Sequence, residues 1–213
     1  MKTKTILFDL DGTLTDSGEG IINSVIPALV HFGISVPDRK TLGEFVGPPL
    51  HDTFVKYGIA EENTDEAIAI FRSRYNTVGK FENIPYPGIV ELLQTLKKHG
   101  HTLLVATSKP EVLAKEVMAH FQIDVYFDCI CGATLDRSRV NKEDVIDYLL
   151  KQNGTAENMV MVGDTAFDVN GAAAFGIPTI GVSWGYGKVS DMQSAGAVAI
   201  ANTTEKLLAL LEQ

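Results

Sequence analysis

The sequence predicts an α/β protein, built as a doubly wound parallel sheet with an all-helical unit inserted after the first strand. Apolar runs of strand length alternate with segments of helical character over most of the chain, and one wide gap between the first two runs contains no convincing strand. The chain has 213 residues, of which 45% are hydrophobic, so it can bury a large core.

The expected strands are short apolar runs that lack an exposed polar face, as is typical of buried parallel strands. They are Thr5–Leu10, Thr102–Ala106, Phe127–Cys131, Met159–Val162 and Pro178–Val182. The helices expected between and after them are Gly88–His99, Pro110–His120, Asn141–Gln152, Ala166–Phe175 and Thr204–Leu211. Strict alternation of this kind indicates right-handed crossovers and a parallel sheet.

The segment between the first two expected strands is predicted to contain helices only. They span Gly20–Phe32, Arg39–Phe45, Leu50–Tyr57 and Thr64–Val78. A crossover between parallel strands needs one helix, so the surplus predicts a separate helical unit over residues 15–82, with a sheet-containing core formed by residues 1–14 and 83–213. Pro27 interrupts the first of these helices, because it has no N–H to donate to the carbonyl of Asn23. We expect a kink there, or a helix that starts later.

The net charge and the hydropathy of the chain limit the classes of binding partner and the location that we expect for the protein. Asp and Glu outnumber Lys and Arg by 27 to 18, a net charge of -9, which argues against a nucleic-acid partner and an acidic membrane surface but leaves small anions possible. The first apolar run stops at Asp9, too short for a signal peptide or a membrane span. We expect a soluble cytoplasmic protein, of an oligomeric state that the sequence does not indicate. Cys129 and Cys131 are expected to be buried thiols, since their spacing suits neither a disulfide nor a zinc site.

The first strand ends in two carboxylates, in "ILFDLDGT". Asp9 and Asp11 lie two residues apart, so both point to one face at the carboxyl end of the strand, where open α/β sheets bind ligands. Gly12 then lets the backbone turn away. Asp-Gly is also a common hairpin signal, but "TLTDSGEG" is a poor second strand. A calcium loop is excluded, because its sixth and twelfth positions hold Leu14 and Gly20.

A second strand also ends in acids, in "MVMVGDTAFDVNGAA". Asp164 closes the strand, and Asp168 follows at the start of a helix, where it could simply cap that helix. If the two strand ends meet, four carboxylates converge, and their repulsion raises their pKa values unless a cation lies among them. Hard oxygen ligands of this kind suit Mg²⁺. The predicted metal-site residues are Asp9, Asp11, Asp164 and Asp168.

Groups suited to a phosphate follow two further strand ends. Thr107 and Ser108 offer a hydroxyl and a free N–H before a helix, and Lys142 begins another helix. Taken singly, the two hydroxyl residues could be helix caps and the lysine a solvated surface residue. Beside two acidic strand ends, they predict a phosphate site.

These motifs together resemble those of the haloacid dehalogenase superfamily, specifically its phosphatases. The matching segments are "DLDGT" (Asp9–Thr13), Thr107 after an apolar strand, a later lysine, and "GDTAFD" (Gly163–Asp168). The helical insertion is similar to the C1-type cap of that superfamily. "FVGPPLHDTF" (Phe45–Phe54) and "GVSWGYG" (Gly181–Gly187) resemble its phosphoglycolate phosphatase-like branch.

The resemblance implies that Asp9 is a nucleophile that forms an aspartyl phosphate, and that Asp11 protonates the leaving oxygen and later activates water. It implies that Mg²⁺ is held by the Asp9 carboxylate, the Asp11 backbone carbonyl and Asp164, with Asp168 in support.

It further implies that Thr107 and the Ser108 amide hold phosphate oxygens, and that Lys142 neutralises charge on the transferring group. Many relatives carry this lysine in a Lys-Pro-x-Pro segment. Here it stands in "RVNKEDV", so Lys109, in "TSKP", is the alternative.

The expected function is Mg²⁺-dependent hydrolysis of a small phosphorylated metabolite, such as phosphoglycolate or a nucleoside monophosphate. A hydrolytic dehalogenase is disfavoured, because such enzymes lack the second acid, here Asp11. A sugar phosphomutase and a catalytically idle binding module remain the alternatives. The Gly-Pro-Pro loop before Leu50 and His51 is expected to bring these two residues over the substrate, unless it is an ordinary helix connection with a surface histidine.

Overall fold

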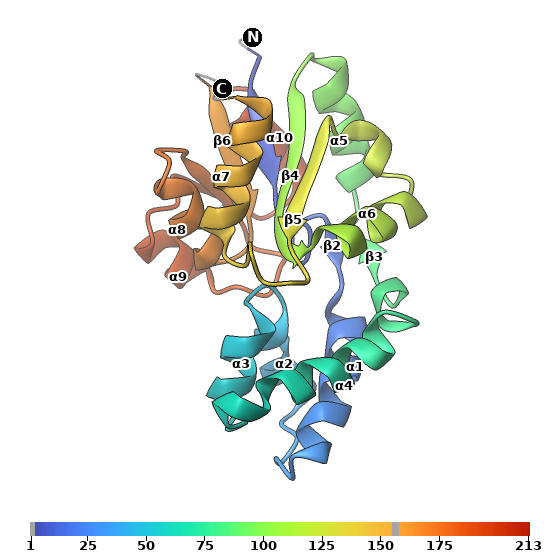
Figure 1. The fold of residues 1–213 in the computed structure, drawn as a ribbon. Coiled ribbons are helices and arrows are strands. Elements are labelled where there is room, and N and C mark those ends of the chain that lie inside the picture. The colour runs from blue at the N-terminus through green and yellow to red at the C-terminus, as the bar shows by residue number, and fades with distance from the viewer. Residues whose placement is uncertain (1–2, 155–157) are drawn as a thin grey trace.

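A six-stranded parallel sheet organises the larger part of the molecule, and a helical unit projects from one end of it (Figure 1). The computed structural model describes residues 3–154 and 158–213. The strand order is β5-β4-β1-β6-β7-β8. The strands are β1 (Thr5–Phe8), β4 (Thr102–Pro110), β5 (Cys129–Ala133), β6 (Met159–Gly163), β7 (Thr179–Val182) and β8 (Ala199–Ala201). With β1 at the centre, the residues that follow β1, β4 and β6 lie next to one another.

Helices cover both faces of this sheet. They are α5 (Ile89–Lys98), α6 (Glu111–His120), α7 (Lys142–Asn153), α8 (Ala166–Ala173), α9 (Val189–Ser194) and α10 (Thr204–Leu211). Successive residues of β1 point to opposite faces: Ile6 and Phe8 pack in the cluster that holds α5, α6 and α10, and Leu7 packs in the cluster that holds α7 and α8. Both clusters are fully apolar, which explains why the strand sequences show no polar alternation.

The inserted unit has an apolar core of its own. It contains α1 (Gly18–His31), α2 (Arg39–Leu42), α3 (Leu50–Lys56) and α4 (Thr64–Tyr75), with short 3-10 turns at Gly43–Phe45, Glu61–Asn63 and Gly79–Phe81. Its buried residues include Val25, Leu29, Phe54 and Phe71, and Leu113 of α6 packs against them. Two two-residue strands, β2 (Thr15–Asp16) and β3 (Ile84–Pro85), pair antiparallel where the chain leaves the sheet domain and returns. We call the helical unit the cap.

The predicted fold class is confirmed, and several element boundaries were wrong. The segment expected to lack strands contains β2, and the prediction missed β8 and α9. β8 is a three-residue edge strand, Ala-Ile-Ala, too short and too weakly apolar to stand out. β4 continues to Pro110, and α6 starts at Glu111, because an irregularity in the pairing with β5 keeps the chain extended past Thr107.

The first cap helix starts at Gly18 and contains Pro27, so the expectation of a later start was wrong. The cysteines are free, as expected: Cys131 is buried and Cys129 is half-buried, with 3.5 Å between their sulfur atoms.

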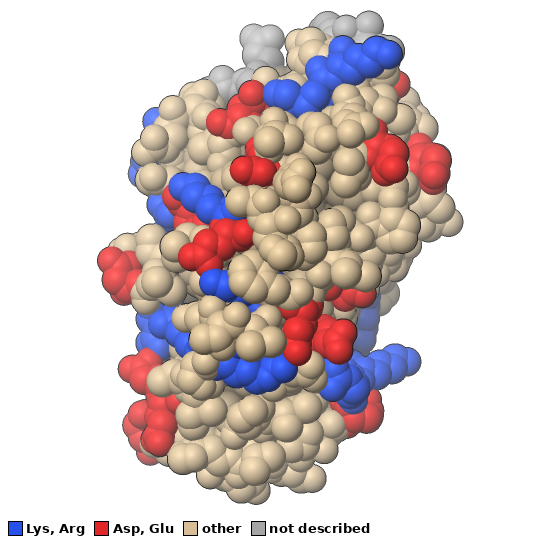
Figure 2. Space-filling model, turned by 90° about the vertical axis from the view of Figure 1, so that its right-hand side faces the viewer, with Lys and Arg blue, Asp and Glu red and all other residues tan. Residues whose placement is uncertain are grey.

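Within the described residues, no helix combines the length and the hydropathy that crossing a membrane requires. Figure 2 shows that acidic and basic side chains are interspersed on the face it views, without one large patch of either sign.

Candidate active site

Three carboxylates from two strand ends meet at the mouth of the sheet. Asp9 follows β1, Asp164 follows β6, and Asp168 lies in the first turn of α8. One oxygen of each lies within 4.8 Å of the others, and all three residues are buried. The parallel pairing of β1 with β6 therefore brings together three of the four carboxylates that the sequence predicted to converge, and the fourth, Asp11, lies outside this cluster.

Gly12 is required by this convergence. Its φ is +84°, and a Cβ built on it would lie 2.3 Å from Oδ2 of Asp164. Gly185, in the loop after β7, is equally confined: its Cβ would also lie 2.3 Å from that oxygen. Two backbones thus pass so close to Asp164 that neither position has room for a side chain.

Asp164 is oriented by the loops around it. Its Oδ2 accepts a hydrogen bond from the backbone N–H of Tyr186 at 2.8 Å, and its Oδ1 accepts one from the Thr13 hydroxyl at 3.3 Å. The indole N–H of Trp184 donates to the carbonyl of Thr13 at 3.1 Å and so joins the two loops. The sequence pointed to "GVSWGYG" only as a family resemblance. Its closely spaced glycines were the available signal of a close backbone approach.

Lys142 reaches the carboxylates from the first residue of α7. Its Nζ donates to Asp9 Oδ1 at 2.8 Å and to the carbonyl of Ala106 at 2.9 Å, and lies 2.8 Å from Asp168 Oδ1. The side chain is 3% exposed, so the alternative of a solvated surface lysine was wrong. A capping box between Asn141 and Asp144 starts the helix at this point and fixes where the lysine emerges.

Lys109 binds the other acid of the first motif. Its Nζ donates to both oxygens of Asp11 at 3.0 Å, and it also contacts the hydroxyl of Tyr75, a residue of cap helix α4. The ammonium lies 4.8 Å from the centre of the Tyr75 ring. The two candidate lysines are therefore divided between the two aspartates. No sequence pattern pointed to Tyr75, because its contact with Lys109 joins residues that are distant along the chain.

Thr107 and Ser108 do not cap a helix. α6 has Pro110 as its N-cap and no side-chain capping bond. Thr107 is buried, and its hydroxyl oxygen accepts the N–H of Lys109 at 3.2 Å. Ser108 is half-buried and lines the same cavity as Asp11. Both residues lie on β4 beside β1, at the height of the acidic strand ends.

Asp168 does cap its helix, and it also binds a lysine. Its Oδ2 accepts the backbone N–H of Thr165 at 3.0 Å and the Thr165 hydroxyl at 2.9 Å, which completes a capping box. Its Oδ1 pairs with Lys142. The capping interpretation and the supporting role expected beside the metal site are therefore both compatible with its position.

The electrostatics of the cluster suit a cation. Burial raises the pKa of Asp9 to about 6, against the opposing effect of Lys142. Burial, followed by the charges of Asp168 and Asp9, raises the pKa of Asp164 well above its usual range. Buried carboxylates with raised pKa values and only oxygen donors fit a hard divalent ion such as Mg²⁺, held by Asp9 and Asp164 with Asp168 beside them.

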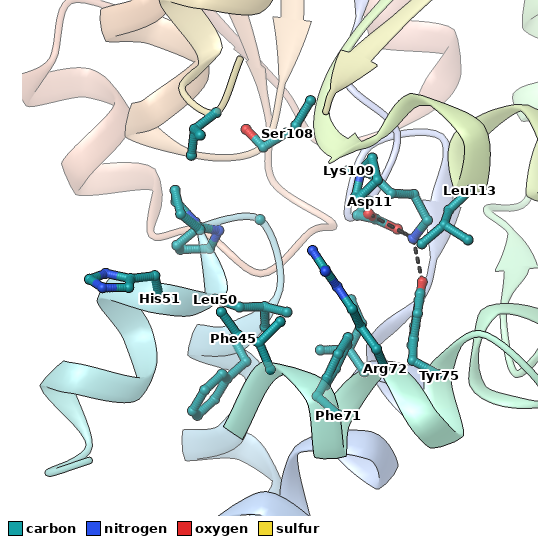
Figure 3. A pocket seen from close by; sticks show the side chains of 18 of the residues that line it. Asp11, Phe45, Leu50, His51, Phe71, Arg72, Tyr75, Ser108, Lys109 and Leu113 are labelled. Carbon is teal, nitrogen blue, oxygen red and sulfur yellow. Dashed lines mark hydrogen bonds and ion pairs between the residues drawn. The ribbon is translucent and has the colours of Figure 1, made fainter. Parts of the chain in front are cut away.

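A cavity of about 420 Å³ lies between this site and the cap (Figure 3). Asp11, Ser108 and Lys109 line its core side, and Leu50 and His51 line its cap side, at the start of α3. His51 is half-buried, and its Nδ1 lies 3.0 Å from Oδ1 of Asp52. The loop of the Gly-Pro-Pro segment therefore faces the core.

The chain resembles known proteins in sequence and in fold. A match to the family described as haloacid dehalogenase-like hydrolase covers residues 6–182. The chain belongs to this family. A crystal structure of a predicted phosphatase from Clostridium acetobutylicum covers all of this chain and is itself fully covered, with 43% identity and a TM-score of 0.95.

Curated relatives carry several names. A 5'-nucleotidase of Pseudomonas aeruginosa is 44% identical over 91% of this chain and 89% of its own length. A tyrosine-protein kinase, PtkA, of Mycobacterium tuberculosis is 43% identical over 95% of this chain and 70% of its own. A phosphoglycolate phosphatase of Agrobacterium fabrum is 29% identical over 97% and 92%. With the family match, the 5'-nucleotidase, the phosphoglycolate phosphatase and the phosphatase structure identify the chain as a phosphatase-type hydrolase of the family.

Proposed function

We propose that the protein hydrolyses phosphate monoesters of small metabolites, with Mg²⁺ as cofactor and an aspartyl phosphate on Asp9 as intermediate. The observation that carries the proposal is the contact of Lys142 with Asp9 beside Asp164 and Asp168. A buried lysine keeps the carboxylate of Asp9 ionised at neutral pH and fixes the direction in which its oxygens point. An ionised and oriented carboxylate is what an attack on phosphorus requires.

In this proposal one oxygen of Asp9 attacks phosphorus, and the bond to the leaving oxygen breaks in line. Asp11 gives its proton to the leaving oxygen. A water then attacks the phosphorus of the aspartyl phosphate, the bond from phosphorus to Asp9 breaks, and Asp11 takes a proton from that water. Lys109 is placed to hold Asp11 through both carboxylate oxygens. Thr107, the amide of Ser108 and Lys142 bind the oxygens of the transferring group and offset its charge.

Mg²⁺, when bound, would neutralise the substrate phosphate and draw it toward Asp9. Asp9, the backbone carbonyl of Asp11 and Asp164 are the proposed ligands. Thr13 and the amide of Tyr186 keep Asp164 turned toward the site. Asp168 acts through its contact with Lys142 and its place beside the other carboxylates.

The cap, proposed as residues 15–82, selects the substrate. Its loop with Leu50 and His51 faces the catalytic residues across the cavity, so it is placed to contact the part of a substrate beyond the phosphate. A cavity of about 420 Å³ accommodates a small metabolite. Relatives named 5'-nucleotidase and phosphoglycolate phosphatase support phosphorylated metabolites, rather than nucleic acid or lipid surfaces, as substrates.

The test is release of inorganic phosphate from 4-nitrophenyl phosphate and from a panel of phosphorylated metabolites, with Mg²⁺ and with a chelator. We expect turnover that needs Mg²⁺ and falls at least about a hundredfold in Asp9→Asn, which removes the nucleophile and little volume. Activity of Asp9→Asn above about a hundredth of wild type would contradict covalent catalysis as the main route. Isomerised sugar phosphate in place of free phosphate would indicate a mutase, and ligand binding without turnover would indicate an idle module.

A further inference from the structure

The cap side of the cavity carries an arginine whose charge is unpaired. Arg72 lies on α4, and Figure 3 shows its side chain running from that helix toward the core. Every other arginine in the chain has a polar partner: Arg39 with Asn23, Arg74 with Glu82, Arg137 with Asp65 and Arg139 with Glu111. Within residues 3–154 and 158–213, the guanidinium of Arg72 has no hydrogen bond or ion pair of its own.

The surroundings of Arg72 favour a bound anion. The cavity is lined by three cationic side chains, Arg72, Lys109 and Arg137, and two anionic ones, Asp11 and Asp52, in a protein of net charge -9. Asp11 is held by Lys109, and Asp52 contacts His51. Burial, followed by the charge of Arg137, lowers the pKa of Arg72, and the charge of Asp65 opposes this effect only in part. An unpaired guanidinium on a cavity wall is costly to desolvate unless a ligand supplies the anion.

Apolar groups surround the same arginine. Ile68 and Phe71 of α4, Phe45 and Leu50 line the cap side of the cavity, and Leu113 of α6 packs with the cap core and also lines it. The ring of Phe71 stacks on Tyr75 at 4.9 Å between centres, which fixes the wall beside Arg72. A ligand that fills this cavity therefore contacts both an apolar surface and the guanidinium.

We propose that Arg72 forms an anion-binding subsite, so that the preferred substrates are phosphate monoesters whose leaving group carries a second anionic group, a carboxylate or another phosphate, on an apolar or planar body. This inference rests on the proposed function, because it assumes that the transferred phosphate binds at Asp9. The phosphate then lies at the core end of the cavity and the second anion at the cap end. Arg72 determines specificity and takes no part in the chemistry.

The test compares substrates of one shape and different charge. We expect wild-type kcat/KM to be at least about tenfold higher for 4-carboxyphenyl phosphate than for 4-carbamoylphenyl phosphate, because a charged hydrogen-bonded pair contributes about 1.5–3 kcal/mol. Adenosine 3′,5′-bisphosphate against adenosine 5′-monophosphate is the matching pair for a second phosphate. A preference in one pair only identifies which anion the subsite takes, and no preference in either overturns the proposal.

Variants of Arg72 test whether this residue causes the preference for substrates with a second anionic group. Arg72→Met, which keeps the length of the side chain, should bring the kcat/KM ratio of the charged to the uncharged substrate close to one. Arg72→Lys should keep part of the preference, because it keeps the charge without the planar fork. Arg39→Met, a cap variant outside the cavity, should retain the full ratio. If Arg72→Met melts like wild type and keeps the ratio, the subsite is not at Arg72. If it does not fold, the Arg72→Lys ratio decides: an unchanged ratio overturns the assignment.

A binding measurement separates this proposal from the proposed function. Calorimetry with the dephosphorylated products, 4-hydroxybenzoate and 4-hydroxybenzamide, needs no turnover. Tighter binding of the benzoate to wild type but not to Arg72→Met supports the subsite even if no phosphate ester is hydrolysed. Hydrolysis of both aryl phosphates with equal affinity for the two products leaves the phosphatase function standing and removes the subsite.

Discussion

Gly12→Ala should disable the site from a position that carries no functional group. The new Cβ would lie 2.3 Å from Oδ2 and 2.7 Å from Cγ of Asp164, whereas ordinary contact begins at 3.4 Å. Asp164 must therefore shift by about 1 Å, and a misplacement of about that size can reduce turnover by about a hundredfold. The shift also strains the bonds that the carboxylate accepts from Thr13 and Tyr186.

Stability should fall for two separable reasons. The φ of +84° costs an alanine about 1–2 kcal/mol by itself. The displaced, partly unbonded carboxylate adds a further cost of about 1–3 kcal/mol. Gly100→Ala isolates the first contribution, because Gly100 has the same φ of +84° and its Cβ would meet only Thr3, at 3.7 Å.

The assay is urea unfolding of both variants, together with kcat for 4-nitrophenyl phosphate. We expect Gly100→Ala to lose about 1–2 kcal/mol of unfolding free energy and to keep its activity. Gly12→Ala should lose at least about 1 kcal/mol more and about a hundredfold in kcat. Equal losses of stability in the two variants, with near wild-type turnover in Gly12→Ala, would refute the argument that Asp164 confines this glycine.

Three further outcomes are expected. Lys142→Ala should weaken inhibition by vanadate at least about tenfold more than Lys109→Ala does, because Lys142 contacts Asp9 whereas Lys109 contacts Asp11. The reverse ranking would assign the charge-neutralising role to Lys109. Replacing Leu50 and His51 with alanine should change relative kcat/KM among natural substrates severalfold, because both residues line the cavity. A uniform change across all substrates, including 4-nitrophenyl phosphate, would show that this loop does not determine specificity. Burial lowers the pKa of His101, whose Nδ1 accepts the N–H of Lys4 at 3.0 Å, so the unfolded chain binds the proton more readily than the folded protein does. The free energy of unfolding should therefore fall as the pH drops below about 6.5. In urea unfolding, His101→Gln should show a smaller fall than wild type, and an equal fall would assign the effect to other groups.

The sequence was informative where local rules apply. Residues two apart on a strand share a face, and the ends of neighbouring parallel strands meet, so Asp9 and Asp11 could be placed at one strand end, and Asp164 beside Asp9, without coordinates. The same reasoning placed Thr107 at the carboxyl end of another strand. The roles of these residues stay predictions until the variants are measured.

What the sequence could not supply depends on contacts between distant segments. Tyr75 is one of two aromatic residues in α4, and only the packing of cap against core brings it to Lys109. Arg72 and Arg74 lie on different sides of the same helix, and Arg74 forms an ion pair with Glu82. The choice between Lys142 and Lys109 was also open, because both lysines follow strand ends, and only the geometry divides them between Asp9 and Asp11.

The central claim is that Asp9 carries the phosphoryl group. Its most direct test is to quench the protein during turnover, reduce any acyl phosphate with borohydride, and map the modified residue by mass spectrometry. The account predicts homoserine in place of Asp9, dependent on substrate and Mg²⁺, and more of it in Asp11→Asn, where hydrolysis of the intermediate is slowed. Rapid turnover with no modification at Asp9 in either protein, or modification at another residue, would contradict it.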